Sequence, residues 1–242
     1  PGVNNNELMN PSLSQLLTPS DFNLPGQRLL QFGRSASSGT DYSSQELFAE
    51  LAVGAPFSDV PSALQPQTGL VARYRPFTTV PPTAVNPTNP NTGSRFGHQL
   101  VHADTLNRGI PGELWVSEPG RNITQSLPLA SAGQVVRLGR DLIDTGGIIP
   151  LPSASFGPNL LNIGASADDE FGTMMVRGNF NGFGGDEILI GVPGFDWPLP
   201  ISDPTSNSGA LLEISWDRDP VPRPDPDLLF RDSFEQAPVI TL

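Results

Sequence analysis

The sequence predicts an all-β protein built from short strands and many turns. Glycine (25 residues) and proline (27 residues) are abundant in the 242-residue chain, and both favour turns over long helices. Short apolar segments, such as 51–53, 114–116 and 188–190, recur between these turns and argue against a disordered middle. A set of landmarks also repeats three times in the same order, which indicates a repeat architecture.

Each repeat begins with a Phe-Gly pair, ends its second strand on a Gly-Ala-Pro-like sequence, and opens its third strand on glycine. The pairs are Phe32-Gly33, Phe96-Gly97 and Phe171-Gly172; the strand ends are 54–56, 117–120 and 191–194; the opening glycines are Gly69, Gly133 and Gly209. This order resembles the FG-GAP repeat, the blade unit of integrin-α-type β-propellers, in a bacterial secreted form. The resemblance covers about residues 30 to 215 and implies β-propeller-like blades.

The landmarks divide the chain into three parts. Residues 1–30 are an N-terminal arm with an apolar segment. Residues 31–216 hold the three FG-GAP-like blades, at about 31–94, 95–170 and 171–216. Residues 217–242 begin with alternating prolines, which favour an extended linker, and end in an apolar tail at 228–234 that is similar to a short motif of secreted Gram-negative proteins.

Three blades pose a problem of closure, because propellers hold about four to eight. The chain could dimerise into a six-bladed ring, or residues 1–30 and 210–242 could form a degenerate fourth blade. Alternatively, the terminal segments could add strands to neighbouring subunits and build a filament, since a head-to-tail contact that does not close gives a fibre. We expect some form of self-assembly.

Charge and composition narrow the partners. The net charge is −12 and all thirteen basic residues are arginine, so nucleic acid and anionic membranes are disfavoured. No apolar stretch reaches the roughly 18 residues of a membrane span. An acidic chain without lysine or cysteine fits an extracellular or cell-surface protein, although compositional drift would give the same result. The chain starts at Pro1 without a leader, so we expect any export signal to have been removed.

The resemblance implies a calcium loop in each blade, and the third repeat keeps it best. Its ligand positions fall on Asn179, Asn181, Phe183, Gly185 (by its carbonyl) and Glu187. Amides replace two carboxylates, and the phenyl ring of Phe183 offers no oxygen. Because ligand charge sets the affinity for Ca²⁺, we expect a weak or empty site and no other cofactor. The corresponding glutamates of the other repeats, Glu50 and Glu113, sit in still poorer loops.

Support for catalysis is absent from the sequence. His98 and His102 lie on one face of a predicted strand and could form a metal or proton-transfer patch with Asp104, but a structural role is the simpler interpretation. The chain has no cysteine nucleophile and no Gly-x-Ser-x-Gly elbow. The acidic run 168–170 could supply half of a glycosidase carboxylate pair or form a solvated turn.

Our first hypothesis is therefore a secreted, non-enzymatic FG-GAP propeller protein in adhesion or extracellular structural assembly. Its partners would be further copies of itself and a cell-surface protein or glycan. By analogy with the FG-GAP family, the binding loops would be connections 57–68, 76–94, 121–132 and 195–208. One alternative is a lectin-like propeller in which Trp115, Trp197 or Trp216 stacks on sugars. The other is a hydrolase subunit with an acidic site around Asp168.

Overall fold

The computed structural model describes about half of the chain. The described residues are 18–22, 31–40, 49–59, 65–75, 82–87, 90–105, 113–124, 128–138, 149–150, 167–182, 184–195, 209–214 and 239–241. Within these ranges, one short 3-10 helix, η3 (Pro19–Phe22), accompanies fourteen β-strands. The predicted all-β fold is confirmed. No helix in the described ranges is long and apolar enough to cross a membrane.

Each repeat forms a small sheet whose strands follow one another in chain order. The first sheet contains β1 (Ser35–Thr40), β2 (Ala49–Ala55), β3 (Leu70–Tyr74) and β4 (Thr83–Val85), all antiparallel. Strand β4 lies inside segment 76–94, which the sequence predicted to be a connection between strands. Three residues bounded by prolines are too few to show the alternation that identifies a strand.

The second sheet repeats this arrangement. Its strands are β5 (Leu100–Ala103), β6 (Glu113–Glu118), β9 (Gln134–Leu138) and β10 (Ile149–Pro150), again antiparallel. A separate hairpin of β7 (Ile123–Thr124) and β8 (Pro128–Leu129) forms within the connection from β6 to β9. That connection is one of those predicted to bind partners.

The third sheet differs only in its last strand. Strands β11 (Met174–Gly178), β12 (Glu187–Val192) and β13 (Ala210–Ile214) are antiparallel, while β14 (Val239–Thr241) pairs with β13 in parallel. Strand β14 comes from the segment assigned to the C-terminal tail. Residues 18–22, which include η3, are the described part of the N-terminal arm 1–30, and the apolar segment 228–234 of the tail lies outside the described residues.

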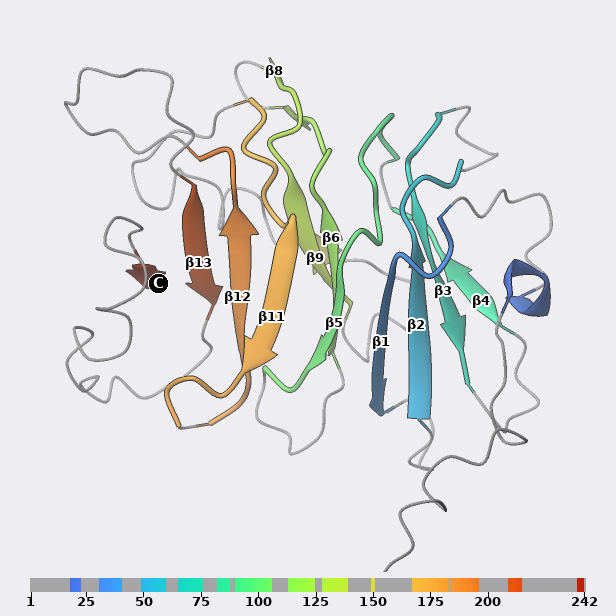
Figure 1. Ribbon diagram of the computed structural model, residues 1–242, viewed down its shortest axis with the longest axis horizontal. Helices are drawn as coiled ribbons and strands as arrows, with labels where there is room; N and C mark the ends of the chain where they lie inside the picture. Colours follow the sequence, from blue (N-terminus) through green and yellow to red (C-terminus); the bar gives the residue numbers. More distant parts are fainter. Residues whose placement is uncertain are drawn as a thin grey trace, which may run out of the picture.

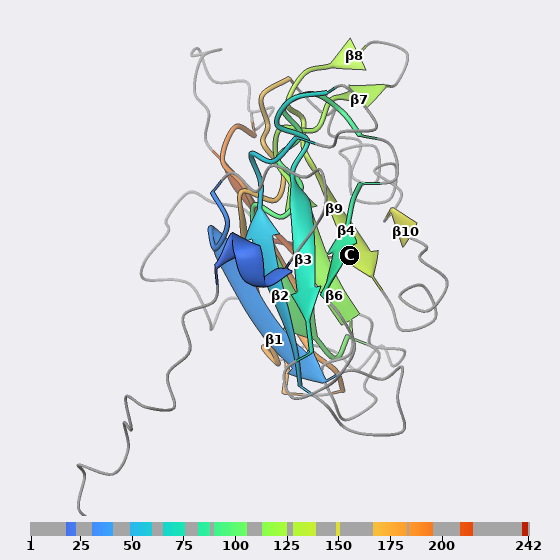
Figure 2. The same ribbon diagram turned by 90° about the vertical axis from the view of Figure 1, so that its right-hand side faces the viewer.

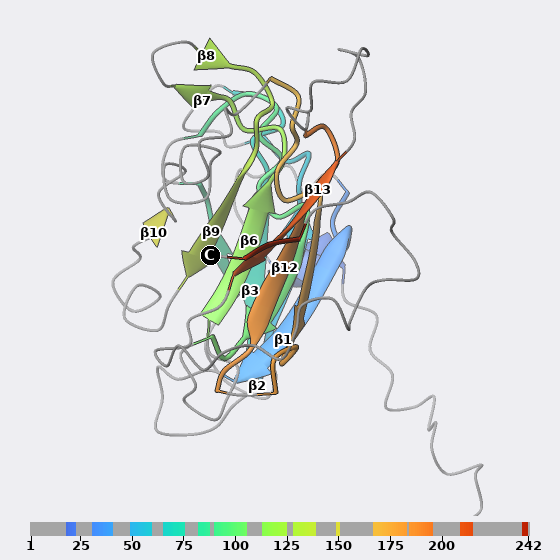
Figure 3. The same ribbon diagram turned by 90° about the vertical axis from the view of Figure 1, so that its left-hand side faces the viewer.

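The three sheets stand side by side in chain order (Figure 1). Their first strands, β1, β5 and β11, are neighbours, with β5 contacting both of the others. Figure 2 shows the outer side of the first sheet with η3 in front of it. Figure 3 shows the array from the side of the third sheet. The array therefore has two inner interfaces, between neighbouring sheets, and two outer faces.

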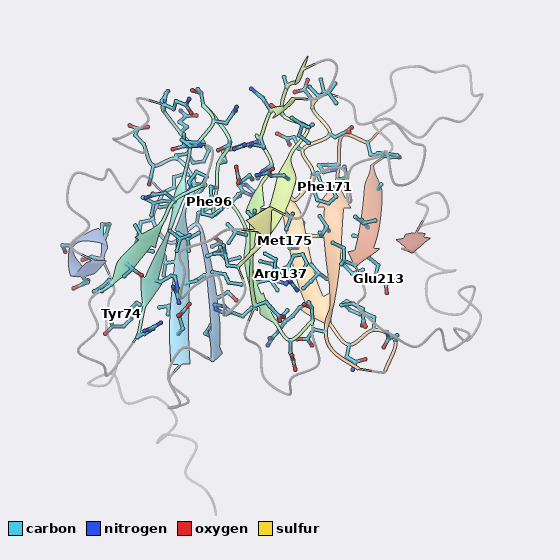
Figure 4. The ribbon with its side chains drawn as sticks, turned by 180° about the vertical axis from the view of Figure 1, so that it is seen from behind. Tyr74, Phe96, Arg137, Phe171, Met175 and Glu213 are labelled. Atoms are coloured by element: carbon cyan, nitrogen blue, oxygen red, sulfur yellow. The ribbon has the colours of Figure 1, made fainter. Side chains whose placement is uncertain are left out.

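Apolar side chains fill both inner interfaces. Between the first and second sheets lie Ala52, Val71, Phe96, Leu100, Leu114, Val116, Val136 and Leu138. Between the second and third sheets lie Val101, Ala103, Trp115, Val135, Met175, Ile188, Ile190, Leu212 and Ile214. Figure 4 shows Phe96 at the first of these interfaces and Met175 at the second. Burying each large side chain stabilises the fold by about 1.5–3 kcal/mol.

Backbone hydrogen bonds join neighbouring sheets at the Phe-Gly pairs. Gly69 forms an isolated parallel bridge with Phe96, and Gly133 forms the same bridge with Phe171. The amide of Phe96 donates to the Thr68 carbonyl at 2.9 Å, and that of Phe171 donates to the Ala132 carbonyl at 3.0 Å. The landmarks that repeat in the sequence are therefore the residues that connect one sheet to the next.

Candidate functional site

Three buried glutamates mark corresponding places in the three sheets. Glu50, Glu113 and Glu187 lie at the beginning of β2, β6 and β12, and their exposures are 3%, 3% and 1%. A carboxylate removed from water is costly unless partners compensate it. Each of the three glutamates has a different set of partners.

The turn of the third repeat holds the predicted calcium ligands. The Glu187 Oε2 accepts from the amide of Phe180 at 2.6 Å and from the amide of Asn181 at 3.4 Å. The side-chain nitrogen of Asn181 donates to Glu187 Oε1 at 2.7 Å. Asn181 and Glu187 are thus brought together, whereas Asn179 is exposed and Phe183 lies outside the described residues.

These contacts do not fit a calcium ion. Calcium needs six to eight oxygen ligands, and Glu187 is the only charged one among Asn179, Asn181, Gly185 and Glu187. Both oxygens of Glu187 accept from N–H groups, and Asn181 turns its nitrogen toward the carboxylate. Asp186 points elsewhere, because its Oδ2 accepts from the Asp104 amide at 2.8 Å. Among the described residues, no group of three or more His, Asp or Glu side chains could hold a metal.

In the second repeat, Thr105 donates the hydrogen bonds to the buried glutamate, as Asn181 does in the third repeat. Glu113 Oε2 accepts from the backbone amide of Thr105 at 2.8 Å and from its Oγ1 at 2.9 Å. Thr105 follows the end of β5, so the carboxylate ties the end of the first strand to the beginning of the second. Glu187 does the same with Asn181. Hydrogen-bond donors of the chain close both turns.

Glu50 of the first repeat belongs to a buried ion cluster. Arg73 on β3 binds both of its oxygens, one through Nε at 2.8 Å and the other through Nη2. His102 on β5 places Nε2 3.9 Å from Glu50 Oε1, across the interface between the first two sheets. Burial by itself raises the pKa of Glu50, but the interactions with His102 and Arg73 outweigh burial and lower this pKa to about 2. Glu50 is therefore ionised at neutral pH.

The two histidines are buried components of the interface. His98 is 8% exposed and His102 is 4% exposed. Burial, followed by the charges of Arg34 and Arg95, lowers the pKa of His98 against an opposing effect of Glu170. His102 faces Glu50, while Asp104 contacts Asp186 of the third repeat, both by its amide and by its carbonyl, which accepts from Asp186 N at 3.0 Å. These described contacts connect the three sheets.

The acidic run 168–170 lies at the contact between the second and third sheets. Asp168 is exposed and has a left-handed φ of 67°, and its amide donates to the Ala130 carbonyl at 2.8 Å. Asp169 is 3% exposed. The Oε1 of Glu170 binds Arg95 Nη2 at 2.7 Å. The run thus serves the contact between sheets, and Glu170 is bound to an arginine.

Sequence reasoning missed a fourth buried glutamate, Glu118 at the end of β6. Its partners are Gln134 Nε2, at 2.9 Å from Oε1, and Arg121 Nη1, at 3.5 Å from Oε2. Burial raises the pKa of Glu118 despite these partners. An alignment of the three repeats could have identified it, because Glu118 aligns with the apolar residues Ala55 and Val192.

Tryptophan stacking on sugars finds no support at Trp115. Its side chain is fully buried between the second and third sheets. Trp197 and Trp216 lie outside the described residues. Residues 60–64 of connection 57–68 and residues 196–208 of connection 195–208 also lie outside them, and partner binding by these connections remains a prediction.

Comparison with known proteins adds no relative. No protein-family model matches the chain, and no curated protein matches it. The assignment of a function therefore depends on the repeats and on the contacts described above.

Proposed function

We propose that the three sheets are blades of an FG-GAP β-propeller and that the protein is secreted and acts without catalysis, in adhesion or extracellular structural assembly. The repeated contact between sheets carries this proposal. Gly69 with Phe96 and Gly133 with Phe171 form the same bridge, made by the same landmark residues. The adjacency of β1, β5 and β11 supports it further, because the inner strands of a propeller surround a common axis.

The polar clusters of the described residues favour a surface-acting protein over an enzyme. Glu50, Glu113 and Glu187 are each buried and occupied by donors of the chain. Glu170 is bound to Arg95. A general acid or nucleophile has to reach a substrate, and these groups face the interior or one another.

Binding by the purified chain tests the proposal. We expect saturable surface plasmon resonance signals with at least one member of a panel of extracellular matrix proteins. Replacing connection 57–68 by a glycine-serine linker of equal length should abolish this signal, while replacing 41–48, at the opposite end of β2, should not. A signal on a glycan array alone would favour the lectin-like alternative. Hydrolysis of a glycoside panel, lost in Asp168→Ala, would overturn the proposal.

A further inference from the structure

The outer face of the third sheet exposes apolar side chains. In the described part of the chain, the exposed large hydrophobic residues are Met174 (51%), Val176 (45%) and Phe180 (40%). Met174 and Val176 lie on one face of β11, in register with Gly191 and Leu189 of β12. Leu211 of β13 continues the row through Gly191. This surface, formed by Met174, Val176, Leu189, Gly191 and Leu211, is called the β11 face below.

The matching faces of the first two sheets are covered by the next sheet. On the first sheet, Ser35 Oγ donates to the Gly97 carbonyl at 2.7 Å, and Ser37 Oγ accepts from the His102 amide at 2.9 Å. On the second sheet, Val101 and Trp115 are buried against the third. Met174 and Val176 occupy the places of Ser35 and Ser37 in the repeat, so a partner of the β11 face would meet apolar groups.

Two glycines at corresponding places in the first and third sheets show how closely a partner could approach the β11 face. A Cβ added to Gly54 would lie 2.1 Å from the Gly97 carbonyl oxygen, so the first interface requires glycine there. Gly191 holds the same place in the third repeat, yet its nearest described neighbour for such a Cβ is Met174 Cβ at 3.4 Å. The sequence keeps the space that the first interface needs, and no described residue fills it.

The glycine that opens the third strand of each sheet also has a close neighbour at the inner interfaces and none among the described residues at the third sheet. A Cβ at Gly69 would lie 2.2 Å from the Phe96 oxygen, and one at Gly133 would lie 2.4 Å from Phe171 backbone atoms. At Gly209 the nearest described atom would be the Pro193 oxygen at 3.5 Å. Gly209 nevertheless has the same local bond, from its amide to the Phe195 carbonyl at 3.0 Å, that Gly69 makes to Ser58 at 2.9 Å.

The beginning of the first sheet carries the complementary half of the contact. A Cβ at Gly33 would meet no described atom within 4 Å, whereas one at Gly97 or Gly172 would meet the preceding sheet at 2.7 Å or 2.9 Å. Ala36 is exposed where its counterparts Leu100 and Met175 are buried.

The backbone of this first Phe-Gly pair is already in the conformation of the two inner pairs. Gln31 has φ 54° and Gly33 has φ 85°. The corresponding angles are 60° and 86° at Arg95 and Gly97, and 50° and 90° at Glu170 and Gly172. A preorganised contact loses less conformational freedom on binding.

We propose that the β11 face binds the Phe32-Gly33 pair and β1 of a second copy of this chain, with the geometry of the first inner interface, in which Gly54 holds the place of Gly191. This inference rests on the proposed function, because it treats each sheet as a blade that docks on the preceding one. The second copy is the chosen partner because both halves of the contact occur in this chain, at opposite ends of the array. Such a contact is head-to-tail.

Analytical ultracentrifugation of the purified full chain over a concentration series tests the inference. We expect a dimer or a longer oligomer, with the dissociation constant at least tenfold weaker in Gly191→Ala. Met174→Asp/Val176→Asp should be monomeric. Phe180→Ser is the matched control, because it also removes an exposed hydrophobic side chain but lies in the turn beyond the β11 face; it should associate like the native chain.

The stability of each variant separates lost binding from lost folding. Gly191→Ala should unfold at the native temperature or slightly above it, because the isolated chain has room for a methyl group. A monomeric native chain up to about 100 µM, or equal association of all variants, would overturn the inference. A monomeric chain that binds a matrix protein would overturn the inference and leave the proposed function intact. An oligomeric chain that binds no matrix protein would support the inference and count against the proposed function.

Discussion

Glycines at corresponding places occur both at the inner interfaces and at the outer ends of the array. At the inner interfaces they lie in close contact with the neighbouring sheet, and at the ends no described residue approaches them closely. At an inner interface, a Phe-Gly pair packs against the preceding sheet so closely that Gly54 and Gly69 have no room for a side chain. At the two ends, Gly33, Gly191 and Gly209 retain the same residue type, and no described neighbour approaches closely. The comparison teaches that the Phe-Gly pair is a docking element between sheets.

The largest difference in the free energy of unfolding should come from truncating one apolar side chain at an inner interface and one on an outer face. Trp115→Ala leaves a cavity between the second and third sheets, so we expect a loss of about 3–5 kcal/mol in the free energy of unfolding. Met174→Ala changes a residue that is 51% exposed, so the dilute chain should lose no more than about 0.5 kcal/mol. Urea denaturation measures both. Equal losses would mean that the two faces are equally packed.

The ion cluster of the first inner interface should give the next largest effect. Glu50→Gln leaves Arg73 buried without its counter-charge, and we expect a loss of about 3 kcal/mol at pH 7. The pKa of Glu50 is lowered to about 2, so its contribution is present above the ordinary glutamate pKa and is lost as pH falls toward 2.

Thermal unfolding of the native chain and Glu50→Gln at pH 7, 4.5 and 2.5 measures this effect. The gap between the two melting temperatures should narrow as pH falls. A Glu50→Gln gap that is independent of pH would contradict the assignment.

Glu118 should behave in the opposite way. Burial raises its pKa, so its ionised form is disfavoured in the folded state, and this cost appears as pH rises above the ordinary glutamate pKa. We expect Glu118→Gln to be as stable as the native chain at pH 7, within about 1 kcal/mol, or slightly more stable. Denaturation at pH 4 and pH 7 measures this. A loss confined to pH 7 would show that the carboxylate is needed in its ionised form.

Calcium should have the smallest effect. Because N–H donors satisfy Glu187, 1 mM Ca²⁺ or a chelator should change the unfolding free energy by less than about 0.5 kcal/mol, the stabilisation that a millimolar site would give. Asn181→Asp is the informative variant, because it places a second carboxylate beside Glu187. Calorimetry should show that calcium stabilises this variant. Stabilisation of the native chain by several degrees would contradict the described contacts.

The sequence predicted the fold class and the beginning of each sheet, and it missed features that depend on contacts between side chains. The all-β class followed from short apolar segments between turns, and the Phe-Gly pairs marked the beginning of every sheet. Strand β4 was missed because three residues are too few to show alternation, and the ion pair of Glu50 with Arg73 was missed because its partners lie on different strands. The roles of Asn181 and Thr105 were also missed. Residue spacing led to the prediction of a calcium loop, but spacing does not reveal that N–H donors of the chain bind the carboxylate.

The two Gly-Phe bridges have a geometric consequence. Because they use the same hydrogen bonds, each joins the Phe-Gly pair of one sheet to the same place on the preceding sheet, and sheets that follow this contact alone are related by one rotation and translation. Repeating one such operation gives either a closed circle, after a number of steps set by the angle, or a rising spiral. That number is a property of the Gly-Phe contact and is independent of how many sheets one polypeptide carries. Duplication or loss of a whole repeat would then change the length of the chain while leaving the curvature of the assembly unchanged.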